Sequence, residues 1–355
     1  MKERILRCST CVLPNTTPGI SFNEEGVCNY CTSYRMFKVK GERKLLQILD
    51  AKRNPKMKYE CIVNISGGRD SAYTLLKMKK DYGMKVLALN YANPFTDKQA
   101  EKNINNMVAA LNVDIIRFDH RSALFEACFR NNLKAWVRNP SPAMVPMMCT
   151  GCKIIWRDIL RIAKRNEITL IVNGGNPYEY TSYKKELLKV SHTENLLTTY
   201  LINIKGLTAE ISRNYHYLNP KCIPTFVKGY LFGNQYSLGV RLLGKQTTCI
   251  DFFHFIQWNE KDILSRIKRE LNWDFPHYLE STWRWDCQIG HLKDYMYMKT
   301  LGMTEKDDFY AKLVREGLMT RTEALARLKK ENRLHVDKIA ELIHQLGLSP
   351  KYFLT

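Results

Sequence analysis

The chain has 355 residues, of which 45% are hydrophobic and 25% charged, as in an ordinary globular protein. No stretch reaches the roughly 18 consecutive apolar residues of a membrane span, and the N-terminus lacks the apolar core of a signal peptide, so we expect a cytoplasmic protein without a membrane span. Lys and Arg number 55 against 35 Asp and Glu, and the net charge of +20 favours polyanionic partners or a solvated basic surface; because the charge is spread along the chain, we do not expect nucleic acid among the partners.

Four cysteines open the chain in two short knuckles, Cys8-x2-Cys11 and Cys28-x2-Cys31. In a reducing cytoplasm, such spacing indicates metal ligands or redox chemistry rather than disulfides. A redox pair needs only one knuckle, whereas two knuckles supply the four thiolates of a tetrahedral zinc site. We therefore predict that residues 1–40 form a zinc-binding unit that its metal stabilises, with a role in nucleic-acid binding left open.

Strands and helices are expected to alternate after this unit. Short apolar runs predict buried strands, and longer stretches with helical spacing predict helices. Expected strands cover 61–65, 85–91, 114–118, 169–173 and 250–256, and expected helices cover 42–53, 72–78, 97–111, 121–137 and 150–166. Such alternation implies right-handed crossovers between parallel strands. The predicted fold class is therefore α/β, with a doubly wound parallel sheet that has helices on both faces.

Two regions depart from the alternation. Residues 176–248 follow no clean period, and their aromatic residues and glycines favour a large insertion that shapes a substrate pocket. From about residue 304 the chain is expected to be helical, since 320–323 has the spacing of a capping box. We accordingly divide the chain into the zinc-binding unit at 1–40, a main domain at 41–300 and a C-terminal helical region at 301–355.

Residues 66–71, with the sequence SGGRDS, lie between a predicted strand and a predicted helix. In this place successive backbone N–H groups can converge on an anion at the helix N-terminus. Gly67 and Gly68 permit positive φ and let a phosphate touch the backbone, and the hydroxyls of Ser66 and Ser71 can donate to phosphate oxygens. The plain alternative is a glycine turn with an aspartate cap, but the whole string and its context favour a phosphate loop.

The two charged residues of the loop have different expected roles. Arg69 can neutralise phosphate charge and grip two oxygens with its guanidinium. Asp70 is unusual beside an anion, and we expect it to hold a magnesium ion that bridges the phosphates.

The SGGRDS string resembles the SGGxDS signature of the PP-loop ATP pyrophosphatases, which include asparagine synthetase-type, NAD synthetase-type and tRNA-thiolating enzymes. The resemblance implies an adenine nucleotide α hydrolase-like fold and cleavage of ATP between its α and β phosphates, which leaves AMP on a substrate oxygen. Asn90, at the end of the second strand, is then expected near the adenine, and Gly174 and Gly175, after the fourth strand, near the ligand. The expected catalytic residues are Arg69, Asp70 and Ser71. Many family members have lysine in place of Arg69, which keeps the charge.

A second resemblance covers nearly the full length of the chain, to the N-acetyl sugar amidotransferases of bacterial surface-polysaccharide synthesis. The matching segments are 7–14 (RCSTCVLP), 26–31 (GVCNYC), 148–152 (MCTGC), 174–177 (GGNP), 282–287 (TWRWDC) and 317–321 (GLMTR). The resemblance implies an ATP-dependent enzyme that adenylates the acetamido oxygen of an N-acetyl sugar and replaces it with ammonia, giving an acetamidino group in lipopolysaccharide O-antigen or a related glycan. The implied cofactors are ATP, Mg²⁺ and Zn²⁺. Because the sequence shows no convincing glutaminase triad, glutaminase and cyclase-like partner subunits are expected to deliver the ammonia.

A second set of cysteines, Cys149, Cys152 and Cys287, is spread over the chain. In tRNA-thiolating relatives of the PP-loop family, a Cys-x-x-Cys at a similar place joins a later cysteine to hold an iron–sulfur cluster. The resemblance therefore implies a possible [4Fe-4S] site here, with Cys222 as an alternative third ligand. A second zinc site and a set of buried thiols remain open. This set and the basic charge favour an alternative function, tRNA 2-thiolation, while a non-catalytic zinc-ribbon module is disfavoured by the phosphate loop.

Several aromatic and acidic residues lie near the matched segments. Glu179, Tyr180 and Tyr183, shortly after Gly175, can line a sugar site or simply form a pocket wall. Trp283 and Trp285 are expected to pack in the core rather than to stack on a sugar ring.

Overall fold

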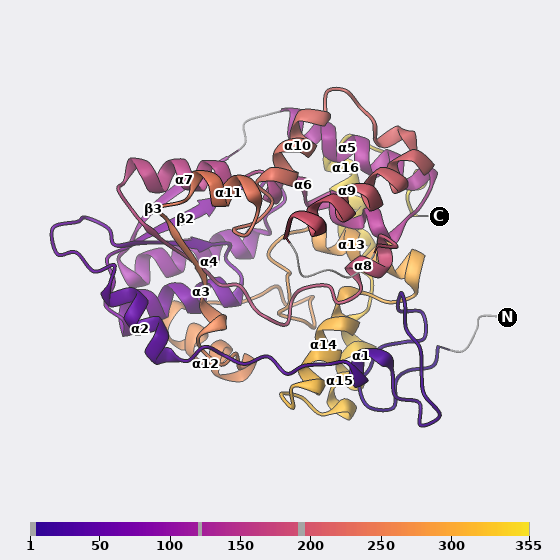
Figure 1. The fold of residues 1–355 in the computed structure, drawn as a ribbon, viewed down its shortest axis with the longest axis horizontal. Helices are drawn as coiled ribbons and strands as arrows, with labels where there is room; N and C mark the ends of the chain where they lie inside the picture. Colours follow the sequence, from indigo (N-terminus) through magenta and orange to yellow (C-terminus); the bar gives the residue numbers. More distant parts are fainter. Residues whose placement is uncertain (1–4, 120–122, 191–195, 355) are drawn as a thin grey trace.

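A five-stranded parallel sheet in the order β3-β2-β1-β4-β5 forms the centre of the computed structural model, which describes residues 5–119, 123–190 and 196–354 (Figure 1). The strands are β1 (Cys61–Ile65), β2 (Val86–Tyr91), β3 (Asp114–Phe118), β4 (Leu170–Asn173) and β5 (Thr248–Asp251). The predicted doubly wound sheet is confirmed. The prediction for the fifth strand is wrong at its end, because Phe252–His254 form a 3₁₀ turn that buries both Phe252 and Phe253.

The strand order places a switch point between β1 and β4. From β1 the chain winds outward to β2 and β3, and it then returns to the other side of β1 for β4 and β5. Ile65, the last residue of β1, pairs with Asn90 of β2, so these two strands end at the same edge of the sheet. In such sheets ligands bind in the crevice outside the carboxyl ends of the strands at the switch point.

Helices pack on both faces of the sheet, because alternate residues of each strand point to opposite faces. Val63 and Ile65 belong to a core shared with α3 (Arg69–Leu76), α4 (Lys98–Leu111) and α12 (Glu260–Leu271). Ile62 faces the opposite side and packs with α7 (Trp156–Arg165) and α11 (Leu238–Leu243). This is the period-two burial expected of a strand covered on both faces.

The other helical segments surround this frame. They are α1 (Asn29–Thr32), α2 (Glu42–Asp50), the π-helix η1 (Lys77–Asp81), α5 (Ala123–Arg138), η2 (Pro142–Cys149), α6 (Thr150–Lys153), α8 (Lys184–Leu187), α9 (Leu196–Arg213), η3 (Tyr215–Tyr217), α10 (Ile223–Leu231), η4 (Phe252–His254), α13 (Ile289–Leu301), α14 (Glu305–Arg315), α15 (Arg321–Glu331), α16 (Val336–Gln345) and η5 (Pro350–Tyr352). The single helix expected at 150–166 is therefore two helices, α6 and α7. Among the described residues, no helix combines the length and apolarity needed to cross a membrane.

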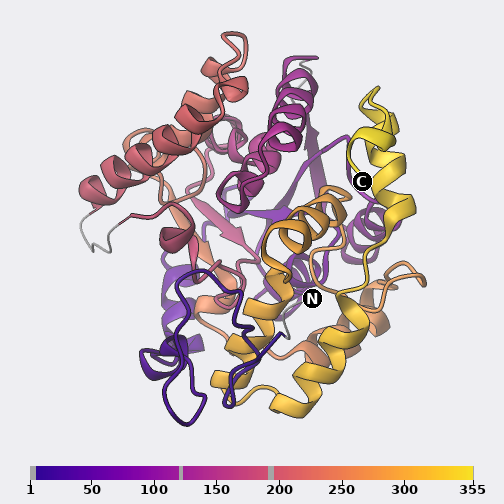
Figure 2. The same ribbon diagram turned by 90° about the vertical axis from the view of Figure 1, so that its right-hand side faces the viewer.

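The expected insertion at 176–248 is mostly helical rather than irregular. Its helices α9, α10 and α11 form a layer that packs on α6, α7 and η3 (Figure 2). The C-terminal region is helical as predicted, with α14, α15 and α16 beyond residue 304.

The two ends of the chain pack against each other. The N-terminal cysteine-rich unit lies beside α14 and α15, the orange and yellow helices of Figures 1 and 2. Arg7 forms an ion pair of 2.7 Å with Asp307, and the Tyr34 hydroxyl donates a hydrogen bond of 2.6 Å to Glu316. The zinc-binding unit predicted from the sequence is thus anchored to the C-terminal helices.

Candidate active site and metal centre

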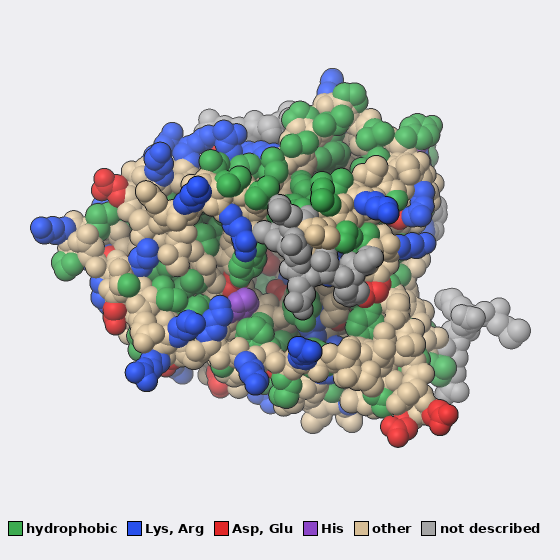
Figure 3. All heavy atoms as spheres, in the orientation of Figure 1, with side chains coloured by type: hydrophobic (Ala, Val, Ile, Leu, Met, Phe, Trp, Pro, Cys, Tyr) green, Lys and Arg blue, Asp and Glu red, His purple; other side chains and the backbone are tan. Residues whose placement is uncertain are grey.

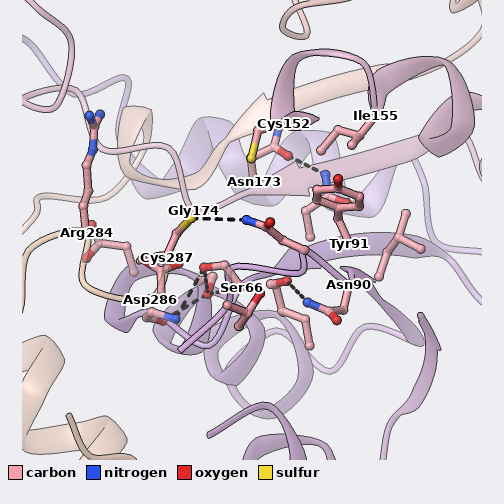
Figure 4. A pocket seen from close by; sticks show the side chains of 18 of the residues that line it. Ser66, Asn90, Tyr91, Cys152, Ile155, Asn173, Gly174, Arg284, Asp286 and Cys287 are labelled. Atoms are coloured by element: carbon pink, nitrogen blue, oxygen red, sulfur yellow. Dashed lines mark hydrogen bonds between the residues drawn. The ribbon is translucent and has the colours of Figure 1, made fainter. Parts of the chain in front are cut away.

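A cavity of about 410 Å³ lies at the carboxyl edge of the sheet, where β1, β2 and β4 end (Figure 4). Its lining has a polar part and an apolar part. The polar part comprises Ser66, Gly68, Arg69, Asp70, Ser71, Glu179, Arg284 and Asp286, and the apolar part comprises Leu89, Tyr91, Phe118, Ile155, Trp156 and Ile159. A ligand with an anionic group at one end and a flat apolar group at the other fits this division.

The loop after β1 requires glycine at position 67. Gly67 has φ of +85°, and a Cβ there would lie 2.3 Å from the carbonyl oxygen of Ala100. Its own carbonyl oxygen accepts hydrogen bonds from Trp273 Nε1 at 2.8 Å and from Asn103 Nδ2 at 3.1 Å. One side chain from α4 and one from the loop after α12 therefore fix the loop where β1 turns into α3.

The N-terminus of α3 faces the cavity. The first N–H groups of a helix have no intrahelical acceptors. In α3 the N-cap is Gly68, which has no side chain to accept from them. The Ser71 hydroxyl donates to the Gly68 carbonyl at 3.0 Å and lies 3.3 Å from the Ser66 hydroxyl, which closes the loop on itself. The geometry leaves backbone donors and the positive end of the helix dipole available to an anion.

The glycines after β4 let that strand approach the phosphate loop closely. A Cβ on Gly174 would lie 2.9 Å from the Ser71 nitrogen, and a Cβ on Gly175 would lie 2.2 Å from Asp251 Oδ1. Gly174 lines the cavity. Gly175, which is not part of the lining, instead allows Asp251 to pack beneath the turn.

Asp70 is a half-buried carboxylate that lines the cavity. Its oxygens accept hydrogen bonds from Trp258 Nε1 at 3.1 Å, Asn176 Nδ2 at 3.3 Å and Arg69 Nε at 3.2 Å. Burial raises the pKa of Asp70 to about 6, because the opposing effect of the Arg69 charge is smaller and the Glu179 carboxylate adds to the rise. A carboxylate held in a costly charged form is typical of a site that binds a cation or a substrate.

Arg69 is turned toward carboxylates. The side chain is only 3% exposed, and its Nη1 donates to Glu260 and, at 2.7 Å, to Thr282. The guanidinium carbon lies 5.0 Å from the centre of the Trp258 ring. Nη2 lies 3.8 Å from Glu179 and has no hydrogen bond in the described part of the chain. The two N–H groups of Nη2 are therefore the donors of the guanidinium that the described chain does not use.

Two further residues of the site, Asp286 and Arg284, had no role predicted from the sequence. Asp286 lies beside Gly68, since a Cβ on Gly68 would lie 3.3 Å from Asp286 Oδ2, and burial raises its pKa. Arg284 has φ of +46° and forms ion pairs with Glu179 at 3.2 Å and Glu305 at 3.7 Å. Both residues belong to the 282–287 segment. The sequence resemblance includes this segment, but residue spacing does not indicate what Asp286 and Arg284 contact.

Asn90 and the predicted sugar-site residues have distinct places. Asn90 lines the cavity and donates a hydrogen bond of 3.0 Å to the Ile65 carbonyl oxygen. Its Oδ1 atom has no hydrogen-bond partner in the described chain. Glu179 lines the cavity, whereas Tyr183 is buried elsewhere and Tyr180 is exposed. Within residues 176–248 as far as they are described, Glu179 is the one residue that lines this cavity. The bulk of the insertion therefore does not form the wall that we expected.

Trp283 and Trp285 are buried, and Trp283 stacks on Phe309 while Trp285 meets Trp273 edge-on. Their predicted core packing is confirmed.

The first cysteine set fits a single zinc ion. The four sulfur atoms of Cys8, Cys11, Cys28 and Cys31 all lie within 4.8 Å of one another, with 3.9 Å between Cys8 and Cys31 and 3.8 Å between Cys11 and Cys28. A tetrahedron with Zn–S bonds of ~2.3 Å has edges of roughly 3.8 Å. The spacing is therefore that of four thiolates around one ion.

Donors surround these sulfur atoms. The backbone N–H of Cys28 donates to Cys8 Sγ at 3.2 Å, and Arg315 of α14 donates to Cys31 at 3.3 Å and to Cys11 at 3.4 Å. Hydrogen bonds with the neighbouring thiols, together with Arg315, lower the pKa of Cys31 to about 3 against the effect of burial. Four thiolates on a zinc ion leave a net negative charge, which the Arg315 guanidinium offsets.

The second cysteine set is spread more widely. Cys152 and Cys287 line the cavity, and Asn93 Nδ2 lies 3.2 Å from Cys287 Sγ (Figure 4). In the described chain, only the first set brings three or more ligand atoms within single-ion distance, so the alternative of a second zinc site is not supported. Cys222, the alternative third ligand, is buried beside Cys128 and does not line the cavity. An iron–sulfur cluster divides its thiolates among separate irons, so it requires a wider spacing than a single zinc ion.

Comparisons with known proteins place the chain only loosely. No family model matches it. An uncharacterised protein of Methanocaldococcus jannaschii is 27% identical over 176 residues, which make up 48% of this chain and 58% of that protein, so the match covers less than two thirds of the relative.

Solved structures with a similar arrangement share little sequence with the chain. NMN synthetase from Francisella tularensis has a TM-score of 0.38 and 12% identity, covering 83% of this chain and 93% of that one. The U34-tRNA thiolase NcsA from Methanococcus maripaludis, solved with its [4Fe-4S] cluster, has a TM-score of 0.33 and 12% identity, covering 89% and 87%. NH3-dependent NAD synthetase from Campylobacter jejuni has a TM-score of 0.29 and 17% identity, covering 57% and 90%. Likenesses this loose transfer no function.

Proposed function

We propose that the protein is an ATP-dependent amidotransferase of the PP-loop type that forms AMP and pyrophosphate. The observation that carries the proposal is the phosphate loop, in which Gly67 turns the chain from β1 into the N-terminus of α3 at the switch point of the sheet. This geometry directs backbone N–H groups and a helix dipole at an anion.

The two-part cavity supports a nucleotide as the anionic ligand. Its polar part, at the loop, takes the phosphates, and its apolar part between β2, β3 and α7 takes the adenine. The unpaired Oδ1 of Asn90 is an acceptor for the adenine amino group. These assignments give Asn90 and Gly174 the binding roles that the sequence predicts for them.

The loop residues then act in distinct ways. Asp70 would hold Mg²⁺ together with phosphate oxygens, and the bound metal would neutralise the charge that develops on the phosphates. In the described chain Asp70, Glu179 and Asp286 do not form a three-carboxylate ion site, so water and phosphate oxygens would complete the coordination. Arg69 positions Asp70 through its Nε, and Ser71 keeps the loop closed.

The proposed reaction replaces an amide oxygen with nitrogen. The acetamido oxygen of an N-acetyl sugar attacks the α phosphorus of ATP, the bond to the β phosphate breaks, and pyrophosphate leaves. Ammonia adds to the carbon of the resulting O-adenylated imidate and loses a proton, and AMP departs with the former amide oxygen. The sugar is left with an acetamidino group. Loop N–H groups would stabilise the charge on the phosphates during the first step.

Support for this substrate comes from the sequence resemblance over the cysteine knuckles and the 282–287 segment. The same resemblance supports glutaminase and cyclase-like partner subunits as the source of ammonia. It also supports zinc in the first cysteine set, whose spacing fits that ion.

The proposal is tested with purified, zinc-replete protein, MgATP, ammonium salt and a nucleotide-linked N-acetyl sugar. We expect AMP and pyrophosphate, and an amidino sugar whose mass reflects replacement of oxygen by an imino group. Asp70→Ala should abolish both products, while Asp50→Ala, which removes an exposed carboxylate from the end of α2, should leave them unchanged. Release of ADP and orthophosphate would contradict the pyrophosphatase mechanism.

One observation favours a second candidate function, tRNA sulfur transfer. Cys152 and Cys287 both line the cavity near the phosphate loop, where a cluster-bound sulfur could reach an adenylated base. Iron and sulfide analysis of anaerobically purified protein tests for the cluster, and nucleoside analysis of tRNA from a deletion strain tests for the reaction. Iron-bearing protein and loss of a thiolated nucleoside would replace sugar amidination with this function.

A further inference from the structure

The helical insertion carries an exposed apolar surface that the proposed reaction does not use. Leu201 and Ile204 of α9, Ile223 and Val227 of α10, and Leu242 and Leu243 of α11 are all exposed, and we call these six residues the insertion surface. Leu201 is 67% exposed and Leu243 is 64% exposed, values uncommon for leucine in helices of a folded protein. Figure 3 shows hydrophobic side chains gathered over α10 and α11.

The spacing of these residues gives each helix an apolar outer side. Leu201 and Ile204 are three residues apart and Ile223 and Val227 four apart, so each pair shares one face of its helix. On the inner side, the Tyr200 and Tyr230 rings meet edge-on at 5.1 Å, and the Tyr200 hydroxyl accepts from the Leu238 N–H at 2.9 Å. The helices are thus fixed to each other from within.

Basic residues outnumber acidic ones around the insertion surface, and Asp158 of α7 is paired with Lys228 of α10 at 3.7 Å. Residues 196–245 contain six Lys or Arg and one acidic residue, Glu210. Glu210 is buried and paired with Arg213, which leaves no free carboxylate on this stretch. Lys205, Lys221 and Arg241 are exposed beside the apolar residues.

Helix α7, which packs on α11, extends the positive charge. Its exposed basic residues are Arg157, Arg161, Lys164 and Arg165. In Figure 3, Lys and Arg side chains lie over α7 next to the hydrophobic side chains over α11. Apolar residues and a positive rim therefore occupy one side of the molecule.

We propose that the insertion surface docks on an anionic phospholipid bilayer. Helices that expose aliphatic residues among Lys and Arg lie in the interface of such bilayers, where the acyl boundary takes the apolar residues and the headgroups take the basic ones. A protein partner is the less favoured occupant, since protein interfaces are depleted of lysine, whereas here Lys205 and Lys228 stand on the same helices as apolar residues of the insertion surface. Docking at this surface would hold the enzyme at the membrane without a spanning helix.

The proposal is tested by co-sedimentation of the full chain with phosphatidylcholine vesicles, with and without phosphatidylglycerol. We expect binding only to the anionic vesicles, weakened by salt because the charges are exposed. Arg241→Glu should weaken binding more than fivefold, because loss of one basic charge near such a surface is worth about fivefold and the new carboxylate is repelled. The double variant Leu242→Ser, Leu243→Ser should abolish sedimentation.

Val336→Ser is the matched control, because Val336 is an exposed aliphatic residue of α16, outside the insertion. It should bind vesicles as the unaltered chain does, and unchanged thermal unfolding shows that all variants are folded. Failure to bind anionic vesicles at low salt, or equal binding by the double leucine variant, would overturn the proposal. A concentration-dependent dimer that the double leucine variant abolishes, without vesicle binding, would assign the surface to self-association.

Discussion

The two cysteine sets begin with the same Cys-x-x-Cys spacing but lie in different surroundings. In the first set, four sulfur atoms lie within 4.8 Å of one another, and backbone N–H groups and Arg315 donate to them. In the second set, Cys152 and Cys287 line an open cavity beside the phosphate loop. The first set is closed by its own chain, whereas the second faces the space that we assign to substrates.

The same contrast extends to the polar groups around each set. Near the first cysteine set, Arg315 and Arg321 satisfy sulfur and carbonyl acceptors of the knuckles. At the cavity, buried atoms of Arg69 and Asn90 have no partner among the described residues. At a structural site the polar groups find hydrogen-bond partners within the protein, whereas at a binding site some polar groups are left to pair with the ligand. Changes at the first should therefore act on folding and changes at the second on ligand binding.

The largest expected effect is that of Cys28→Ser. Structural zinc contributes about 10–16 kcal/mol in small zinc-binding peptides, which exceeds what a unit of this size can gain from its own core. We expect zinc to fall from one ion per chain to none, with early unfolding of the N-terminal unit, measured by metal analysis and calorimetry. Cys152→Ser, in the second set, is the control and should retain both zinc and melting temperature. Equal zinc loss in both variants would erase the distinction between the sets.

The second largest effect is expected from Gly67→Ala, which changes the phosphate loop at the cavity. Both Gly67 and Gly83 have positive φ, which costs a residue with a Cβ about 1–2 kcal/mol, but only at Gly67 would the Cβ meet a backbone atom, at 2.3 Å. We expect Gly67→Ala to abolish ATP binding in calorimetric titration while zinc is retained. Gly83→Ala, with open space around its Cβ, should bind ATP normally. Normal ATP binding by Gly67→Ala would show that the loop does not hold the phosphates.

The predictions from sequence succeeded where the information is local. Each knuckle of the first set closes within four residues, and the loop residues 66–71 are adjacent, so spacing alone identifies them. Strands were recognisable because a strand buried on both faces is a short apolar run. The helices of the insertion were not predicted, because they expose leucine and isoleucine, which blurs the helical period.

The parts of the site that could not be predicted from the sequence depend on residues far apart along the chain. Arg69 was expected to face phosphates, but Glu260 and Thr282, about 200 positions away, turn its guanidinium inward. Asp286 reaches Gly68 only because the chain returns to the loop after α12. No periodicity or spacing rule links residues across such separations, since the contacts arise from the packing of whole elements.

Asp70→Asn tests how much stability the ligand-free protein loses by holding a charged carboxylate at position 70. The pKa of Asp70 is raised from 3.8 to about 6, chiefly by burial, so between those pH values the folded state holds a proton that the unfolded state releases. Stability must therefore fall as pH rises through this window and stay low above it. In ligand-free protein, Asp70→Asn should be more stable than the unaltered chain by about 3 kcal/mol at pH 7 and nearly equal to it near pH 3.5. Denaturant unfolding at the two pH values checks this, and a loss of stability at pH 7 would contradict it.

The smallest effect expected is that of Arg315→Gln, which changes a residue of α14 that contacts the first cysteine set. Arg315 donates to two of the zinc-site sulfur atoms, and groups in this position tune metal affinity by about 10–100-fold. We expect the lower end, about tenfold weaker zinc binding in competition with a chelating dye, because the backbone donors to the sulfurs remain. Arg321→Gln is the control, since Arg321 donates to the carbonyl oxygens of Cys8 and Cys11 rather than to their sulfurs. If both variants weakened zinc equally, Arg315 would act by anchoring the unit to α14 and not by offsetting thiolate charge.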